Sequence, residues 1–424
     1  MSATGIARVH GRRVWDSRGR PTIEVEATLA GGAVGRAIAP AGASTGSGEA
    51  RDLRDGGNRF GGLDVTRAIA SISEIDKALH GLDAAQQSAI DDALRQLDGT
   101  PDKSRLGGNA IVATSMATAW AAAAARGVPL WRHLQCDRGS LPLPEIQIFG
   151  GGAHAGGRVD IQDFMAIAVG ATDYAQALDW TAEVYRAAGT LMSEAGRLSG
   201  VADEGGWWPA FDNNEAAIEM LVRAIERAGL APGQDMAIAL DVAASQFGRH
   251  GRYRLARDDR DLDSDGLSEL LLGWVARYPI VSIEDPLAED DGAGLARFTA
   301  GAGPRLQVVA DDHVVTNAAR IRRAAAAGAA NAALIKPNQA GTLTEAKEAL
   351  AAAHDSGWGA IMSARSGETE DTTIVHLAVG WGIPQIKVGS FARSERMAKW
   401  NEGLRLAESL GGDLPLPRAF PWGR

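Results

Sequence analysis

The chain has 424 residues, of which 45% are apolar, so it is long enough for two or three domains and a large buried core. Its 53 acidic residues outnumber its 43 basic ones and give a net charge of −10, which argues against a nucleic-acid partner but not against a small anionic substrate. A single cysteine excludes an intrachain disulfide, and the lack of an apolar signal or spanning segment predicts a cytoplasmic protein with no membrane partner.

Strand patterns come first along the chain and helix patterns follow. Apolar and polar residues alternate over residues 22–29 and 33–40, with turn glycines between them, which predicts two strands. Apolar residues then recur at three- and four-residue spacing, which predicts helices over residues 64–79, 83–97 and 109–127. Strands followed by helices predict a small α+β domain over residues 1–138. The segment GSLPLP, residues 139–144, is interpreted as a linker.

After this linker, short apolar runs alternate with Ala-rich helical segments, a pattern typical of repeated βα units. Six apolar runs end in a polar residue: Asp241, Glu284, Asp311, Lys336, Ser363 and Lys387. From Glu284 onward they are 27, 25, 27 and 24 residues apart, which is the size of one βα unit. We therefore predict an (α/β)8 barrel over residues 139–424.

The polar residues at the strand ends predict a site at the mouth of this barrel. Barrel strands are apolar inside, and their carboxyl ends meet at one face, where the chemistry of such proteins gathers. Asp241, Glu284 and Asp311 come from three separate strands, and without a cation their charges would repel strongly. Three carboxylates favour a hard divalent cation such as Mg²⁺. The alternative is that each carboxylate pairs with a lysine or arginine.

Cationic residues follow on the later strands. Lys336 and Lys387 would have a lowered pKa in a cationic, partly buried mouth and would then suit a general base, although a plain salt bridge is an equal alternative. Arg365 and Ser366 offer a forked donor and a hydroxyl, which suit an oxyanion such as phosphate.

Two Gly-rich segments earlier in the chain also carry titratable side chains. One holds His154 and Asp163, and the other holds Glu204. Taken alone, each segment is weak evidence, because a single histidine is more often structural and DEGG is ordinary turn chemistry. Neither segment matches a P-loop or a dinucleotide fingerprint, so the glycines do not imply ATP or NAD.

In one order and over nearly its whole length, the chain contains eleven segments that resemble the motifs of the enolase family: VWDSRGRPTIEVE, PAGASTGSGEA, LGGNAI, GGAHA, VADEGG, IALDVAAS, SIEDP, ADDHVVTN, LIKPNQAGTLTEA, SARSGETED and IKVGSFARSERMAKWNE. The resemblance implies an N-terminal α+β capping domain followed by an enolase-type barrel. It implies a lyase that forms an enolate from a 2-phosphoglycerate-like acid and yields an enolpyruvate product. A homodimer or higher homo-oligomer is expected.

The resemblance also implies the metal ligands and the base. Asp241, Glu284 and Asp311 would hold a first Mg²⁺ that clamps the substrate carboxylate, and a second Mg²⁺ would be reached through Ser44. Lys336 would remove the proton α to the carboxylate.

The remaining implied roles concern the substrate and the leaving group. Lys387 would neutralise the substrate carboxylate, which Glu284 also approaches, and Glu204 would be the acid that helps the β-hydroxide leave, with Asp163 as its partner. The implied substrate-binding set is His154, Glu284, Arg365, Ser366 and Lys387.

Three departures from the family pattern lie on the phosphate and leaving-group side. Enolases have histidine at Ala364, glutamate at Asp163 and asparagine at Gly150. One explanation is drift in a redundant, divergent copy; the other is a pocket rebuilt for a different group, as in carboxyphosphonoenolpyruvate synthase, an enolase-like enzyme of phosphonate biosynthesis. The substrate would then be a phosphonate carboxylate rather than a phosphorylated carboxylate. A non-catalytic binding protein on this fold is a third hypothesis, against which the intact metal and lysine side argues.

Overall fold

The computed structural model describes residues 2–43, 45–134, 140–411 and 416–417. The N-terminal unit begins with an antiparallel sheet in the order β1-β2-β3. Its strands are β1 (Ile6–Trp15), β2 (Pro21–Leu29) and β3 (Val34–Ile38). Its helical elements are η1 (Arg59–Gly62), α1 (Thr66–Leu79), α2 (Gln87–Asp98), α3 (Gly108–Ala125) and α4 (Leu130–Leu134). The two strands and three helices predicted for this unit are confirmed.

The helix α3 packs directly on the sheet, and a glycine makes the close approach possible. A Cβ atom added to Gly35 of β3 would lie 2.1 Å from the backbone nitrogen of Ala121 and 2.2 Å from the carbonyl oxygen of Ala117. Any side chain at this position would therefore push the helix off the sheet. Nearly all of α3 is buried, in agreement with its Ala-rich composition.

The second unit is a closed barrel of eight strands. Its strands, in chain order, are β4 (Leu143–Gly150), β5 (Asp163–Ile167), β6 (Ala237–Asp241), β10 (Ile280–Glu284), β11 (Gln307–Ala310), β12 (Ala332–Ile335), β13 (Gly359–Ser363) and β14 (Gln385–Ser390). The six strands predicted from apolar runs are confirmed as β6 and β10 to β14. The fold is the α/β barrel with an N-terminal α+β cap that the sequence predicted.

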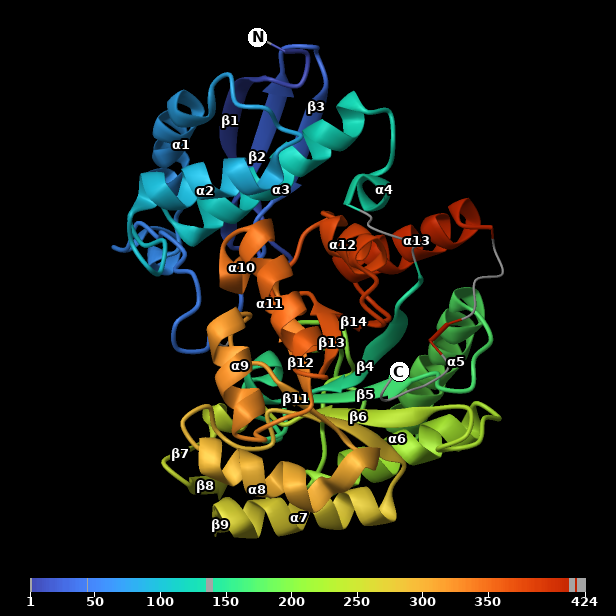
Figure 1. Cartoon of the computed structure of the whole chain (residues 1–424). Coiled ribbons are helices and arrows are strands. Elements are labelled where there is room, and N and C mark those ends of the chain that lie inside the picture. Colours follow the sequence, from blue (N-terminus) through green and yellow to red (C-terminus); the bar gives the residue numbers. More distant parts are fainter. Residues whose placement is uncertain (1, 44, 135–139, 412–415, 418–424) are drawn as a thin grey trace.

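Helices cover the outside of the barrel (Figure 1). They are α5 (Tyr174–Glu194), α6 (Glu215–Arg227), α7 (Ser264–Arg277), α8 (Gly292–Ala302), α9 (Ala318–Ala326), α11 (Leu343–Asp355), α12 (Thr373–Trp381) and α13 (Ser394–Ser409). The short helix α10 (Pro337–Ala340) lies instead at the end of the barrel, where it contacts α3. Three short 3-10 turns, η2 (Gly152–Ala155), η3 (Ala244–Gln246) and η4 (Gly303–Arg305), lie in the loops. A small antiparallel sheet of β7 (Gly248–Arg249), β8 (Arg252–Leu255) and β9 (Arg260–Asp263) follows β6.

The linker prediction is wrong at its end, because β4 already begins at Leu143. Leu143 and Pro144 are buried and pair with Gln385 and Ile386 of β14. A proline near the first residue of a strand is compatible with a sheet. Residue 139 of the predicted linker lies outside the described residues.

The strand β5 runs against its neighbours, and this reversal matters for the site. It pairs antiparallel with both β4 and β6, whereas every other neighbouring pair in the barrel is parallel. Asp163, the first residue of β5, is therefore the register partner of Asp241, the last residue of β6. The start of a reversed strand thus lies at the mouth, together with the ends of the parallel strands.

The N-terminal unit lies over this end of the barrel, where α10 follows β12 (Figure 1). The buried carboxylate of Asp91 in α2 joins the two units: it accepts hydrogen bonds from the Thr344 backbone N–H at 2.8 Å and from the Thr344 and Ser115 hydroxyls, both at 2.6 Å. Burial raises the pKa of Asp91, and these donors oppose the rise. Within the described ranges, no helix has the length and apolar composition needed to cross a membrane.

Candidate active site

The structure brings the predicted carboxylates and lysines together at the mouth of the barrel. Asp241 and Glu284 end adjacent strands and are register partners, and Asp311 directly follows the next strand, β11. Lys336 directly follows β12, and Lys387 lies in β14. All five side chains are buried. Residues more than 100 positions apart in the chain therefore form one polar cluster in a largely apolar interior.

The two lysines contact the three carboxylates directly. Lys387 Nζ donates to Asp241 Oδ2 and to Glu284 Oε2, both at 2.7 Å. Lys336 Nζ donates to Asp311 Oδ2 at 2.5 Å. The sequence left open whether each carboxylate pairs with a lysine or arginine, and the structure shows such pairs. The lysines come from other strands of the barrel and not from positions next to the carboxylates in the sequence.

These ion pairs set the protonation of the lysines. Burial lowers the pKa of Lys336, but the charge of Asp311 outweighs it, so that the pKa is raised. Burial is likewise outweighed at Lys387, where Asp241 and Glu284 raise the pKa well above its ordinary value. The prediction of a lowered lysine pKa is therefore wrong for this arrangement, because carboxylates rather than cations are the nearest charged neighbours.

The three predicted carboxylates offer buried oxygens from three adjacent strands, the ligand type that Mg²⁺ prefers. Among the described residues, however, this triad is not one of the groups whose ligand atoms all lie within 4.8 Å of one another. Two groups do meet this distance: Asp285, Asp311 and Asp312, and the cluster of His154, Asp163 and Glu204. Burial, followed by the charge of Asp241, raises the pKa of Glu284 well above its ordinary value. Ser44, predicted to reach a second ion, lies outside the described residues.

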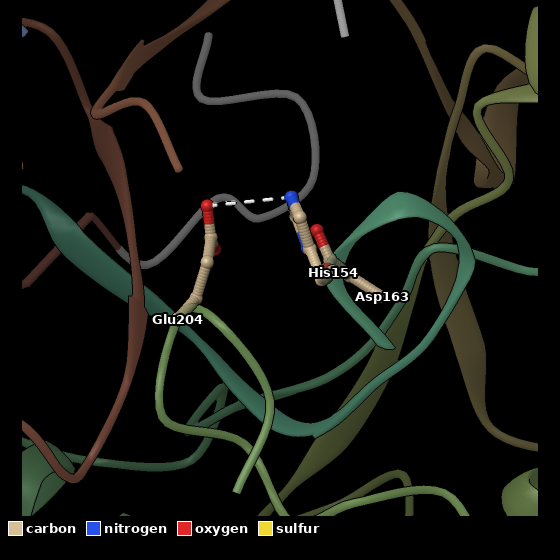
Figure 2. Close-up of side chains that lie close together, drawn as sticks. All are labelled: His154, Asp163 and Glu204. Carbon is tan, nitrogen blue, oxygen red and sulfur yellow. Dashed lines mark hydrogen bonds and ion pairs between the residues drawn. The ribbon is translucent and has the colours of Figure 1, made fainter. Parts of the chain in front are cut away.

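His154, Asp163 and Glu204 form a second cluster, and Figure 2 shows the imidazole between the two carboxylates. Nδ1 of His154 lies 2.9 Å from Asp163 Oδ1, and Nε2 lies 3.6 Å from Glu204 Oε1. Burial alone would lower the pKa of His154, but the charges of Glu204 and then Asp163 raise it to about 9. Burial would raise the pKa of Asp163, yet His154 and Lys387 hold it well below its ordinary value. At neutral pH the histidine is thus a cation between two carboxylates.

Hydrogen bonds from other elements to its backbone hold the loop that carries Glu204 in place. Gly205 has φ of +96°, a conformation that favours glycine, and its carbonyl oxygen accepts a hydrogen bond from the Tyr185 hydroxyl at 2.8 Å. The backbone N–H of Ser390 in β14 donates to the carbonyl oxygen of Glu204 at 3.0 Å. The position of the Glu204 carboxyl group therefore depends on the glycine turn at Gly205. The sequence alone indicated only that DEGG forms a turn.

The predicted phosphate-binding pair, Arg365 and Ser366, lies in the loop after β13, which Arg396 contacts through hydrogen bonds. The fully buried Arg396 donates to the carbonyl oxygen of Arg365 at 2.7 Å and to that of Ser366 at 2.6 Å. The forked guanidinium of Arg365 faces Glu49, with Nη1 2.9 Å from Oε2 and Nη2 3.3 Å from Oε1. The Ser366 hydroxyl accepts a hydrogen bond from Arg18 Nη1 at 3.2 Å.

Glu49 and Arg18 are site residues that the sequence reasoning missed. Both lie in quoted motifs, GASTGSGEA and WDSRGR. Each is a charged residue close to glycines in its motif, and this pattern could have marked both as candidate site residues. Three buried amides were missed as well. Gln162 and Gln339 donate to Asp241 and Asp311 at 2.8 and 2.9 Å, and Gln147 donates to Asp163.

The structure places two of the three family departures in the mouth itself. Ala364 and Asp163 both line an inner cavity of about 30 Å³, which His154, Glu204 and Lys336 also line. This volume holds about one or two waters, so it gives no support to a widened pocket at Ala364.

The third departure, Gly150, has a packing reason. A Cβ atom at Gly150 would lie 2.7 Å from the Cβ of Ala202 and 3.1 Å from Oε1 of Gln147. Ala202 belongs to the loop that carries Glu204, and Gln147 Oε1 accepts a hydrogen bond from Gly206 of the same loop at 2.9 Å. The missing side chain therefore lets this loop pack closely on the end of β4.

The reversed second strand and the N-terminal cap define an enolase-type α/β barrel. Two family models match the chain: that of the enolase N-terminal domain over residues 6–134, and that of the enolase C-terminal TIM barrel domain over residues 138–416. The chain therefore belongs to the enolase family, as its eleven motifs indicated. The family generally uses Mg²⁺ and binds small phosphorylated acids.

Proposed function

We propose that this protein is a Mg²⁺-dependent lyase that removes the proton α to the carboxylate of a 2-phosphoglycerate-like acid and yields an enolpyruvate product. The observation that carries the proposal is the buried convergence of Asp241, Glu284 and Asp311 with Lys336 and Lys387, at 2.5–2.7 Å. Deprotonation next to a carboxylate needs a base on one side and positive charge on the other, and this cluster offers both.

The three carboxylates are the residues that would hold Mg²⁺. When bound, Mg²⁺ would supply the positive charge that stabilises negative charge developing on the substrate carboxylate. Lys387, buried beside Asp241 and Glu284, would neutralise that carboxylate as well. A carboxylate-rich mouth without such cations would repel an anionic substrate.

Lys336 would be the base. It can accept a proton only after its ammonium group has released one to solvent, and this release also ends its ion pair with Asp311. Its ammonium group is buried at a strand end, which fixes its direction toward the cavity that Lys387 and Ala364 also line. A base held in this way needs little reorganisation to reach an α-carbon placed between the two lysines.

The cluster of His154, Asp163 and Glu204 would act on the leaving group. Glu204 would have to take up a proton before the reaction; it would then give this proton to the departing hydroxide, which leaves as water. The imidazolium of His154, 3.6 Å from Glu204 and 2.9 Å from Asp163, would stabilise the carboxylate that is left on Glu204. Arg365 and Ser366 would bind the phosphate, which requires the phosphate to replace Glu49 on the Arg365 fork.

A second candidate is an enzyme similar to carboxyphosphonoenolpyruvate synthase. It is favoured by the positions of Asp163 and Ala364, which depart from the family pattern and both line the mouth beside Arg365. The metal and lysine side matches the family pattern. A change confined to one side of the site supports altered leaving-group or phosphate chemistry with proton abstraction retained.

The test is proton exchange rather than turnover. In D₂O with Mg²⁺, the C2–H signal of 2-phosphoglycerate should disappear from the NMR spectrum with the parent protein and persist with Lys336→Ala. Lys77→Ala, an exposed lysine of α1, is the matched control and should behave like the parent. Exchange that persists in Lys336→Ala would assign the base elsewhere, and no exchange in the parent would reject this acid as a substrate analogue and favour a binding role.

A further inference from the structure

A carboxyl group that the proposed mechanism does not use lies inside the barrel. Glu145 is the third residue of β4 and is only 2% exposed. It is the register partner of Lys387 in β14, and register partners on neighbouring parallel strands point to the same face of the sheet. Lys387 points into the barrel, where it contacts Asp241 and Glu284, so Glu145 points into the barrel as well.

Glu145 has no hydrogen-bond donor in this interior. Within the part of the chain that the structure describes, its buried Oε2 atom accepts no hydrogen bond. Burial raises the pKa of Glu145 to about 7; the charge of Lys387 opposes this rise, and the charges of Asp241 and Asp163 add to it. An unpaired carboxyl group in a protein interior costs free energy that an apolar side chain of similar size would not. Packing alone therefore does not explain a glutamate at this position.

Lys387 has other carboxylates as its present partners. Its Nζ atom lies 2.7 Å from Asp241 Oδ2 and from Glu284 Oε2, and 3.5 Å from Asp163 Oδ2. Glu284 belongs to β10, which lies four strands away from β14 around the eight-stranded barrel, whereas Glu145 belongs to the adjacent strand. The lysine thus reaches across the barrel and leaves the carboxyl group on the neighbouring strand without a donor.

A divalent cation at the mouth would change this pairing. Asp241 Oδ2 and Glu284 Oε2, which accept hydrogen bonds from Lys387, belong to the carboxylates that would hold Mg²⁺. A cation on these carboxylates would repel the ammonium group and compete with its N–H donors for the same oxygens. Lys387 would then need another acceptor, and the adjacent strand offers a buried one that has no donor of its own.

We propose that Glu145 is a positioning residue, whose free carboxylate oxygen takes over the ammonium group of Lys387 when a divalent cation occupies Asp241 and Glu284. The inference rests on the proposed function, because that function places the cation on these two carboxylates. An ammonium group has three N–H donors, so Lys387 can keep one on Glu145 and direct another to the substrate carboxylate. Glu145 thus keeps the lysine charged and paired while the cation is bound.

The test measures Mg²⁺ binding and stability in one variant. Glu145→Met replaces the carboxylate by an apolar side chain of similar size. Isothermal titration with Mg²⁺ alone should show binding at least roughly tenfold weaker than in the parent, the effect of about one hydrogen bond to a charged group. Urea unfolding with a chelator should show no decrease in the free energy of unfolding, because Glu145 has no partner without the cation. Unchanged Mg²⁺ affinity, or a lower free energy of unfolding, would overturn the proposal.

A second background shows whether Glu145 acts through Lys387. In Lys387→Met, the further change Glu145→Met should alter the Mg²⁺ affinity by no more than about twofold, because no ammonium group is left to transfer. An equally large loss in this background would mean that Glu145 acts on the cation directly, and would overturn the proposal. Glu269→Met, at an exposed glutamate of α7, is the control and should bind Mg²⁺ like the parent. No Mg²⁺ binding by the parent would instead reject the proposed function, and this inference with it.

Discussion

Replacing Lys387 by methionine tests whether the buried lysines balance the carboxylates of the mouth. Lys387 Nζ lies 2.7 Å from Asp241 Oδ2, 2.7 Å from Glu284 Oε2 and 3.5 Å from Asp163 Oδ2. Methionine fills much of the same space without the charge. Asp241 keeps a hydrogen bond from Gln162 Nε2 at 2.8 Å, so the loss falls mainly on Glu284.

The expected loss is large and depends on pH. Removing one partner of a buried ion pair costs about 3–5 kcal/mol. Burial and the charge of Asp241 already raise the pKa of Glu284, and loss of Lys387 raises it further. An acid with a raised pKa in the folded state stabilises that state below its unfolded pKa, about 4.3 for glutamate, and this stabilisation is lost as pH rises through the folded pKa. The variant should therefore lose about 3–5 kcal/mol near pH 8 and less near pH 5, where a proton replaces the lysine charge.

The assay is urea unfolding followed by circular dichroism, in the presence of a chelator, at several pH values. Midpoints and slopes give the change in the free energy of unfolding. Lys77→Met, on the exposed face of α1, is the control and should change this free energy by no more than about 0.5 kcal/mol. A loss below about 1 kcal/mol near pH 8, the value of a surface pair, would refute the reasoning. So would a loss that does not shrink toward pH 5.

Three further predictions concern other parts of the structure. Asp91→Ala leaves the Thr344 backbone N–H and its hydroxyl without their carboxylate acceptor, so urea unfolding should show a loss of about 1–3 kcal/mol; an unchanged midpoint would mean that this contact does not join the two units. Gly150→Asn puts a Cβ atom 2.7 Å from a neighbouring methyl group, so the same assay should show a loss of about 1–3 kcal/mol; the comparison is Gly273→Asn in α7, where nothing lies within 4 Å of an added Cβ atom and φ is not left-handed. The double variant Ala364→His with Asp163→Glu should form phosphoenolpyruvate from 2-phosphoglycerate at least about tenfold faster than the parent. If the parent already turns over at an ordinary rate of about 1–10³ s⁻¹, the two departures are neutral.

The sequence by itself determined the capping unit, six barrel strands and the polar groups at their ends. These features follow from local signals, because an apolar run that ends in a polar residue reports both the strand and the end at which it meets solvent. The regular step of about 25 residues, the size of one βα unit, then predicts parallel strands whose ends share one face. Asp241, Glu284, Asp311 and Lys336 were placed at the mouth on this basis, and the structure confirms that position.

Only the tertiary structure decided which of these groups touch. Lys387 pairs with Asp241 and Glu284, 146 and 103 positions away, and Arg365 holds Glu49 over 316 positions. Such contacts depend on strand order, register and the fit of the cap, none of which a local pattern records. The reversed strand β5 is the clearest case: its direction places Asp163 beside Asp241, whereas a parallel strand would have carried its first residue to the opposite end of the barrel.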